Sequence, residues 1–133
     1  MSASASPIRS QTFQKSERLT SRLIFESLIK DGHSYQESPF RLIWIATKLD
    51  TKFPAQVAFS VPKKNFKSAV HRNRIKRMIR EVYRKNKSNF YPLLRQKEKQ
   101  LAILIVYSGK TIPKYAEVEQ KITLILQRLA EIF

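Results

Sequence analysis

Residues 63–87 read KKNFKSAVHRNRIKRMIREVYRKNK, and the rest of this 133-residue chain can be interpreted around them. The stretch contains eleven Lys or Arg residues and one acid, Glu81, so it carries +10 of the net charge of +16. The residues before it and the residues after it carry only +3 each. Charge of this density opposes a compact state through self-repulsion, and it is typical of a surface that binds a polyanion.

The same stretch has the apolar spacing of an amphipathic helix, which we predict from about residue 68 to about residue 87, with Ser68 as its cap. At about 100° per residue, apolar side chains share one face and polar side chains form a ridge opposite. The apolar face consists of Ile75, Met78, Ile79, Val82 and Tyr83. The ridge consists of Asn73, Arg77, Arg80 and Arg84, with Arg74 and Lys76 on its flanks. Glu81 can pair with Arg77 or with Lys85 along the helix.

Helical and strand patterns alternate outside this helix. A short amphipathic helix is predicted at residues 19–30, with Thr20 or Ser21 as its cap and Gly32 just past its end. Strands are predicted at residues 34–38, 40–49, 56–61 and 100–109, and the last is apolar enough to be covered on both faces. A final helix is predicted at residues 114–133. This order predicts an α+β fold, a two-layer sandwich of one sheet and three helices. We expect one domain over residues 13–133 after a flexible N-terminus at 1–12.

Composition narrows the kind of partner. A pI of about 10.4 favours nucleic acid first and an anionic membrane surface second. The absence of Cys fits a reducing cytosol. The N-terminus lacks the apolar core of a secretory signal, and the longest apolar run, at 101–107, is far shorter than the roughly 20 residues of a membrane span. We therefore expect a soluble, cytoplasmic protein without a membrane partner.

The polar residues do not form the pattern of a protein active site. A metal-dependent nuclease needs clustered carboxylates, and acid–base catalysis needs a positioned His, Lys or carboxylate. The ten acids are scattered, and two Gly are too few for a Gly-rich phosphate loop. His33 falls in a turn and His71 near the start of the basic helix, where packing or phosphate contact is the ordinary role. The sequence indicates a binding protein with no catalytic residue or metal site of its own.

Aromatic side chains are a second feature of RNA recognition, because unpaired bases stack on them. Each candidate lies on an apolar element, so burial in the core is the ordinary outcome for most of them. The candidates are Phe13, Phe25, Phe40, Trp44, Phe59 and Tyr107.

Residues 60–84, SVPKKNFKSAVHRNRIKRMIREVYR, strongly resemble the signature of the bacterial ribonuclease P protein component. The family pattern is a strand ending in Ser, a Lys pair, Ala-Val, and Arg-Asn-Arg-x-Lys-Arg with a following Arg-Glu and Arg. The matching residues are Ser60, Lys63, Lys64, Ala69, Val70, Arg72, Asn73, Arg74, Lys76, Arg77, Arg80, Glu81 and Arg84. Residues 17–19, Phe25 and Gly32 match the N-terminal region, so the resemblance covers residues 13–133. The chain departs from the pattern at Ala58, and in a loop at 65–68 that has one extra residue and no Gly.

The resemblance implies the order α-β-β-β-α-β-α, similar to the second domain of ribosomal protein S5, with a left-handed crossover around the basic helix. It implies a 1:1 complex with the catalytic RNA of ribonuclease P, which uses Mg²⁺ to remove the 5′ leader of precursor tRNA while the protein assists. It implies a leader cleft between the first helix and the sheet, with Phe25 and, as a looser match, Phe13. The RNA-binding residues that it implies are Lys63, Lys64, Lys67, Arg72, Asn73, Arg74, Lys76, Arg77, Arg80 and Arg84.

Two other functions stay open for the sequence. A ribosomal or general RNA-binding protein could use the same basic helix without taking part in catalysis. A binder of anionic membranes is less favoured, because the exposed face of the helix is poor in aromatic residues and the strands are buried.

Overall fold

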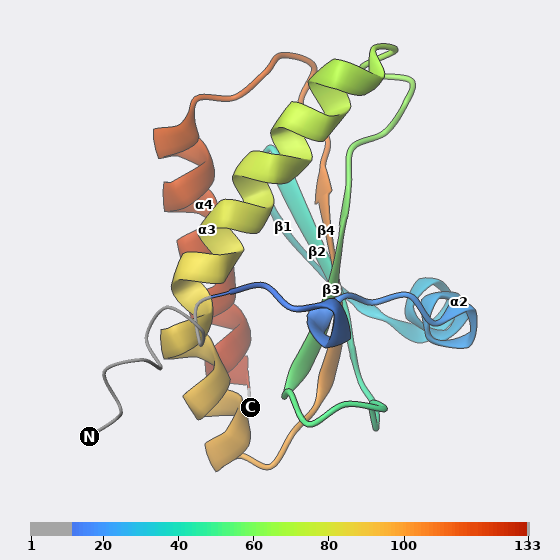
Figure 1. Cartoon of the computed structure of the whole chain (residues 1–133), viewed down its shortest axis with the longest axis vertical. Helices are drawn as coiled ribbons and strands as arrows, with labels where there is room; N and C mark the ends of the chain where they lie inside the picture. The colour runs from blue at the N-terminus through green and yellow to red at the C-terminus, as the bar shows by residue number, and fades with distance from the viewer. Residues whose placement is uncertain (1–11, 133) are drawn as a thin grey trace.

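The elements predicted from the sequence are present, in the predicted order, in the computed structural model, which describes residues 12–132. Figure 1 shows them along the chain. They are the 3-10 turn η2 (Lys15–Glu17), α2 (Arg22–Asp31), β1 (His33–Glu37), β2 (Phe40–Ala46), β3 (Ala55–Ser60), α3 (Ala69–Gln96), β4 (Leu101–Tyr107) and α4 (Tyr115–Ile132). Of the stretch predicted to be a flexible N-terminus, only Thr12 lies within the described residues.

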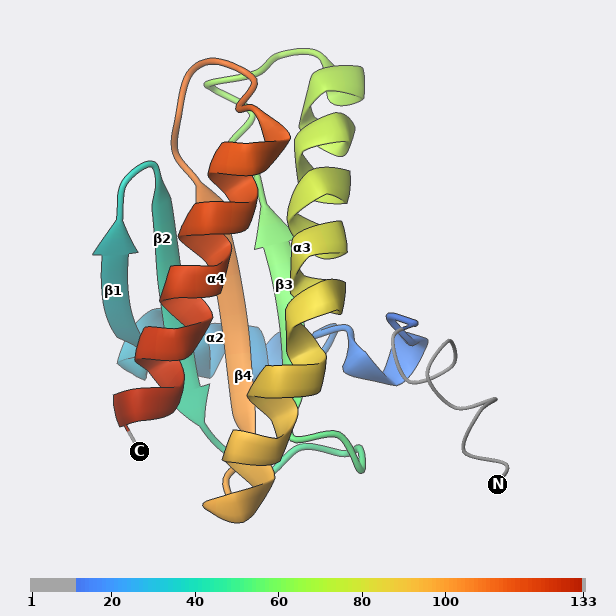
Figure 2. The same cartoon turned by 90° about the vertical axis from the view of Figure 1, so that its left-hand side faces the viewer.

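The four strands form one sheet in the order β1-β2-β4-β3. The pairs β1–β2 and β2–β4 are antiparallel, while β3 and β4 are parallel and are connected through α3. In Figure 2, β3 points upward, α3 lies in front of the sheet and β4 lies to the left of β3. The crossover is therefore left-handed, the rare hand for such a unit. The likeness to ribosomal protein S5 stays a prediction.

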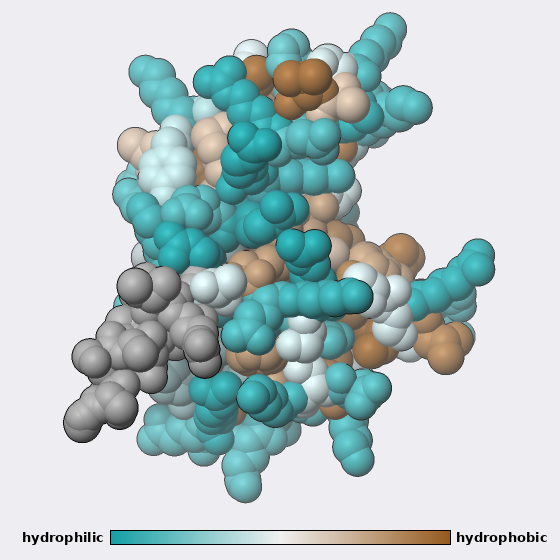
Figure 3. All heavy atoms as spheres, viewed as in Figure 1, coloured by the Kyte–Doolittle hydropathy of each residue, from teal (hydrophilic) through white to brown (hydrophobic). Residues whose placement is uncertain are grey.

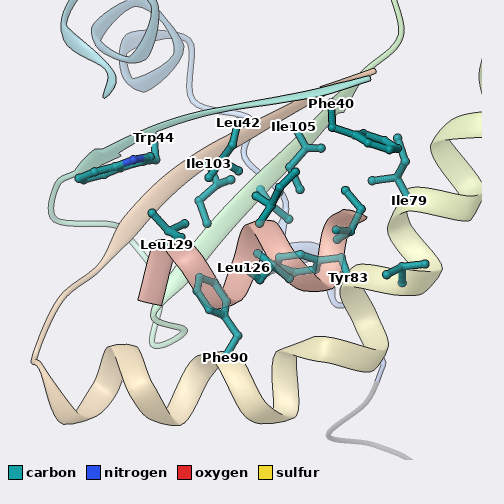
Figure 4. Close-up of a cluster of buried hydrophobic side chains, with 14 of the residues drawn as sticks. Phe40, Leu42, Trp44, Ile79, Tyr83, Phe90, Ile103, Ile105, Leu126 and Leu129 are labelled. Carbon is teal, nitrogen blue, oxygen red and sulfur yellow. The ribbon is translucent and has the colours of Figure 1, made fainter. Parts of the chain in front are cut away.

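The main core lies between the sheet and the pair α3 and α4. Successive side chains of a strand point to opposite faces, so alternate residues of each strand enter this core. Figure 4 shows the sheet residues facing the two helices. The labelled residues are Phe40, Leu42, Trp44, Ile103 and Ile105 from the sheet, Ile79, Tyr83 and Phe90 from α3, and Leu126 and Leu129 from α4.

The opposite face of the sheet is partly covered by α2, which lies across the sheet from α3 and α4 (Figure 1). A second apolar cluster of Leu19, Leu28, Leu49 and Ala102 forms there. The predicted sandwich is thus present. β4 is covered by α3 and α4 on one face but only partly by α2 on the other, where Ala102 is buried while Leu104 and Val106 are half-buried. Ser21 is the cap of α2, since its Oγ accepts a hydrogen bond from the Ile24 amide at 3.3 Å. Gly32 ends α2, where an added Cβ would lie 2.1 Å from the Leu28 carbonyl oxygen.

The helix α3 begins where the sequence predicts but ends later. Ser68 is its cap, accepting a hydrogen bond from the His71 amide at 3.4 Å. The predicted end near residue 87 is wrong, because the helix continues to Gln96 with Pro92 inside it. The extension is stabilised by tertiary packing, since Phe90, Tyr91 and Leu94 are buried. The local sequence does not predict this extension, because residues 85–89 are polar and Pro92 is unfavourable inside a helix.

No helix within residues 12–132 is long and apolar enough to cross a membrane.

Candidate nucleic-acid interface

The ten residues predicted to bind RNA lie between Arg72 and Arg84 of α3 and on the basic loop before this helix, residues 61–68. We call this set the cationic face. Seven of its side chains are exposed and three, Arg72, Lys76 and Arg84, are half-buried. Figure 3 shows hydrophilic residues gathered over α3 in this view, while apolar residues gather around α2. Glu81 is the only acid in the stretch that carries the cationic face.

The basic loop is held by an aromatic anchor. Phe66 is buried and its ring stacks on Tyr107, with 6.2 Å between the ring centroids. Asn65 Nδ2 donates to the Ser108 carbonyl oxygen at 3.4 Å. The only non-Gly residue with a positive φ among residues 12–132 is Glu98, so this loop needs no glycine. The anchor explains how the chain tolerates its departure from the family pattern at 65–68.

Arg72 orders the same loop from the helix side. Its Nη1 donates to the carbonyl oxygens of Phe66 at 2.6 Å and Lys67 at 3.0 Å. These bonds use part of the guanidinium and leave its other N–H groups for a ligand. Arg72 therefore helps to fix the position of the loop lysines Lys63, Lys64 and Lys67, which are exposed.

Glu81 pairs with neither of the two partners that the sequence suggested. Its carboxylate accepts two hydrogen bonds from Arg84, at 2.6 Å from Nη2 and 3.1 Å from Nε. Both i,i+3 and i,i+4 neighbours are within reach on a helix, and here the i+3 residue has the bidentate geometry. These hydrogen bonds, more than the nearby charges of Arg84 and Lys85, lower the pKa of Glu81. The ion pair partly neutralises one arginine of the predicted ridge.

Lys76 and Arg80 face a pocket of about 230 Å³ at the outer edge of β3. The N-terminal segment supplies the other wall of this pocket, through Phe13 and Arg18. Burial lowers the pKa of Arg80, and the positive charges of Arg18 and Arg77 lower it further. The sequence reasoning did not assign Arg18 to the site, because it lies more than fifty residues from the basic helix in the chain.

A buried ion pair holds this N-terminal segment against α3. Glu17 and Lys87 are both buried, and Lys87 Nζ donates to Glu17 Oε1 at 2.8 Å and Oε2 at 3.0 Å. Lys87 Nζ also donates to the Thr12 carbonyl oxygen at 2.5 Å, and the Tyr91 hydroxyl donates to Glu17 Oε2 at 2.6 Å. A charge run predicts solvent exposure for Lys87, so the pattern gave no sign of this contact.

The two aromatic residues predicted for the leader cleft lie on opposite sides of the sheet. Phe25, on α2, is half-buried against the cluster of Leu19, Leu28, Leu49 and Ala102. Phe13 packs against the main core instead, with ring centroids 5.9 Å from both Phe59 and Tyr83. The structure therefore does not bring them into one cleft. Phe40, Trp44 and Tyr107 are core residues.

The family model for ribonuclease P matches residues 13–130, which include α3, the basic loop and the N-terminal segment. The chain belongs to the ribonuclease P protein family. Among curated ribonuclease P protein components, that of Porphyromonas gingivalis is 30% identical over 116 residues, covering 87% of this chain and 85% of the relative. That of Chlorobium phaeobacteroides is 32% identical over 133 residues, covering 91% of each.

Solved structures agree with this family assignment. The ribonuclease P protein of Thermotoga maritima superposes with a TM-score of 0.67 at 26% identity, covering 84% of this chain and 96% of that one. The Staphylococcus aureus protein shares the fold, with a TM-score of 0.68 at 22% identity, covering 90% of this chain and 99% of that one. The resemblance read from the Arg-Asn-Arg helix is confirmed.

Proposed function

We propose that this ribonuclease P protein binds the catalytic RNA of ribonuclease P through its cationic face, and that it also contacts the 5′ leader of precursor tRNA. In this proposal the RNA cleaves the substrate and the protein assists, in a 1:1 complex. The observation that carries the proposal is the cationic face itself: ten basic or amide side chains on one surface, accompanied by one acid that Arg84 already holds.

Electrostatics explain why such a surface assists a reaction between two RNAs. Both RNAs are polyanions, so their approach is opposed by phosphate repulsion that multivalent cations or a basic protein can screen. Arginine is suited to this role because its planar fork pairs with phosphate oxygens and stacks on bases. We therefore expect the protein to raise the affinity for precursor tRNA and to lower the Mg²⁺ concentration required.

Magnesium belongs to the RNA in this proposal. Within residues 12–132 there is no group of three or more His, Asp or Glu side chains that could hold a metal ion. Mg²⁺ prefers oxygen ligands such as carboxylates and phosphates, and the RNA offers many of the latter. The residues of this chain that we assign to the reaction bind and orient RNA.

The leader is assigned to the face of the sheet that α2 only partly covers. Phe25 is half-buried there and could offer a ring to an unpaired base. Ile43 and Leu104 are also half-buried on this face. Phe13 is not part of this proposed leader contact, because it packs on the other side of the sheet.

Reconstitution tests the proposal. Full-length protein is mixed with ribonuclease P RNA and labelled precursor tRNA at low Mg²⁺, and release of the 5′ leader is followed. We expect faster processing with the wild type and a smaller gain with Arg77→Gln, while Arg128→Gln, an exposed arginine of α4, matches the wild type.

Three results separate the alternatives. RNA binding without any gain in processing would support the general RNA-binding function instead. Cleavage by the protein after removal of all RNA would overturn the division of labour. Equal losses from Arg77→Gln and Arg128→Gln would mean that only net charge matters, and not the cationic face.

A further inference from the structure

The pocket at the outer edge of β3 is lined by three cations from two distant parts of the chain. Arg18 comes from the N-terminal segment, while Lys76 and Arg80 come from adjacent turns of α3. Phe13 and Phe59 form apolar parts of the wall. The pocket measures about 230 Å³, which is large enough to admit a phosphate with part of its sugar.

The charge of this pocket is not balanced by the protein. No carboxylate of residues 12–132 lies within ion-pair distance of Arg18, Lys76 or Arg80. Two acids are adjacent in sequence to these cations, and both are engaged elsewhere. Glu17 is fully buried and bound to Lys87 and Tyr91, and Glu81 is bound to Arg84. Burial lowers the pKa of Arg80, and repulsion from the positive charges of Arg18 and Arg77 lowers it further. An anionic ligand would relieve that repulsion.

Arg18 is placed by contacts on both sides of it. Leu19 is buried, and its amide donates to the Val57 carbonyl oxygen at 3.0 Å, which pairs the segment with the edge of β3. On the other side, Glu17 is fixed by Lys87, by Tyr91 and by the Gln14 amide, which donates to Glu17 Oε1 at 2.8 Å. The Arg18 guanidinium lies 5.8 Å from the centroid of the Phe13 ring. A side chain positioned in this way binds a ligand with less loss of conformational entropy.

We propose that Arg18, Lys76 and Arg80 bind a phosphodiester group of RNA in this pocket, and that the buried Glu17–Lys87 pair positions Arg18 for this contact. The proposal rests on the proposed function, because it assumes that the first half of α3 faces RNA. It adds a contact residue outside the basic helix and assigns a positioning role to a charge pair that cannot itself reach a ligand. The phosphodiester can belong to the catalytic RNA or to the precursor tRNA.

The first test uses Arg18→Gln with Arg128→Gln as its control, since both remove one positive charge from an exposed arginine. Binding to ribonuclease P RNA alone is measured over a range of salt concentrations. A lost phosphate contact reduces the slope of log K against log salt by about 0.7–0.9. We expect this reduction for Arg18→Gln and no change for Arg128→Gln.

A second arm identifies the source of the phosphate. The complete ribonucleoprotein is titrated with precursor tRNA and with mature tRNA, which lacks the leader. A loss of affinity in Arg18→Gln that is confined to precursor tRNA assigns the phosphodiester to the leader. A reduced salt slope with ribonuclease P RNA alone assigns it to the catalytic RNA. If Arg18→Gln changes neither the salt slope with ribonuclease P RNA nor the affinity for precursor tRNA, the proposed phosphate contact is overturned. Arg77→Gln is included throughout: if its slope changes while that of Arg18→Gln does not, the further inference fails and the proposed function stands.

The positioning role is tested with the pair Glu17→Gln and Lys87→Met, which leaves the net charge unchanged. In this background the segment that carries Arg18 is no longer held by the Glu17–Lys87 ion pair, so Arg18→Gln should have less than half of its original effect on the slope. An undiminished effect rejects the positioning role. Circular dichroism checks that each variant is folded, and Glu17→Gln alone replaces the double variant if the latter does not fold.

Discussion

Arg72 and Arg74 stand two positions apart in the same motif, yet their surroundings differ. Arg72 is half-buried and donates to the carbonyl oxygens of Phe66 and Lys67, whereas Arg74 is exposed. Burial of a carbonyl group is unfavourable unless the group is hydrogen-bonded, so Arg72 contributes to folding as well as to any ligand contact. The motif alone does not distinguish the two roles.

We predict that Arg72→Ala lowers the free energy of unfolding by about 1.5–3 kcal/mol, the usual range for hydrogen bonds from a charged donor. Arg74→Ala should change it by less than about 0.5 kcal/mol, as expected for an exposed position. Urea unfolding followed by circular dichroism measures both. Equal values for the two variants would show that the contacts of Arg72 do not stabilise the loop.

Glu81 is the one residue that opposes the charge of the cationic face. We predict that Glu81→Gln strengthens binding to ribonuclease P RNA, because it removes a negative charge and releases Arg84 from a bidentate ion pair. Glu131→Gln, which changes an exposed acid near the end of α4, makes the same change in net charge and serves as the control. The affinity of both variants for ribonuclease P RNA is measured at one fixed salt concentration. A general effect of net charge would raise the affinity of the two variants equally, whereas a local effect would raise only that of Glu81→Gln.

At the scale of elements, α3 combines two functions along its length. Its first half carries the cationic face, and its second half holds the N-terminal segment through Lys87 and Tyr91. The second half is helical because Phe90, Tyr91 and Leu94 are buried, which offsets the cost of Pro92. The length of α3 is therefore a tertiary property.

Adjacent leucines test this view of α3. Leu94 is fully buried, whereas Leu93 is 42% exposed. We predict that Leu94→Ala lowers the free energy of unfolding by about 2–5 kcal/mol and that Leu93→Ala lowers it by less than about 1 kcal/mol. Denaturant unfolding measures both values. Similar losses would mean that residues 88–96 do not pack as a continuation of the helix.

At the scale of the whole molecule, a polar network ties the N-terminal segment into the main core. Glu17, Lys87, Tyr91 and Tyr83 form a continuous chain, in which the two tyrosine hydroxyls lie 3.0 Å apart. Burial, above all other causes, raises the pKa of both tyrosines well above their usual range. The folded protein therefore keeps their protons at a pH where the unfolded chain loses them.

This network predicts alkaline sensitivity. Above the usual tyrosine pKa of about 10, the unfolded state binds fewer protons than the folded state, so the free energy of unfolding falls as pH rises. Each buried tyrosine contributes a slope of up to about 1.4 kcal/mol per pH unit. Urea unfolding between pH 9 and pH 11 should show a smaller slope for Tyr83→Phe than for the wild type. An identical slope would show that Tyr83 does not titrate on unfolding.

The element order, the cap of α3 and the gathering of ten polar side chains on one surface follow from the sequence alone. These properties depend on local periodicity and on charge density, which a single chain displays directly. The prediction of the partner RNA followed from one motif, Arg72-Asn73-Arg74, in its context. The helices could be predicted because each has an apolar face with helical spacing, and the strand at 101–107 because its sequence is continuously apolar.

Only the tertiary structure decided which charges are free and which are used within the protein. The long end of α3, the Glu81–Arg84 ion pair, the separation of Phe13 from Phe25 and the buried Glu17–Lys87 pair all depend on contacts that local periodicity does not specify. Arg18 joins Lys76 and Arg80 only because the N-terminal segment pairs with the edge of β3. Sequence patterns report which side chains share a face of one element, whereas a site formed by three segments requires knowledge of how those segments pack.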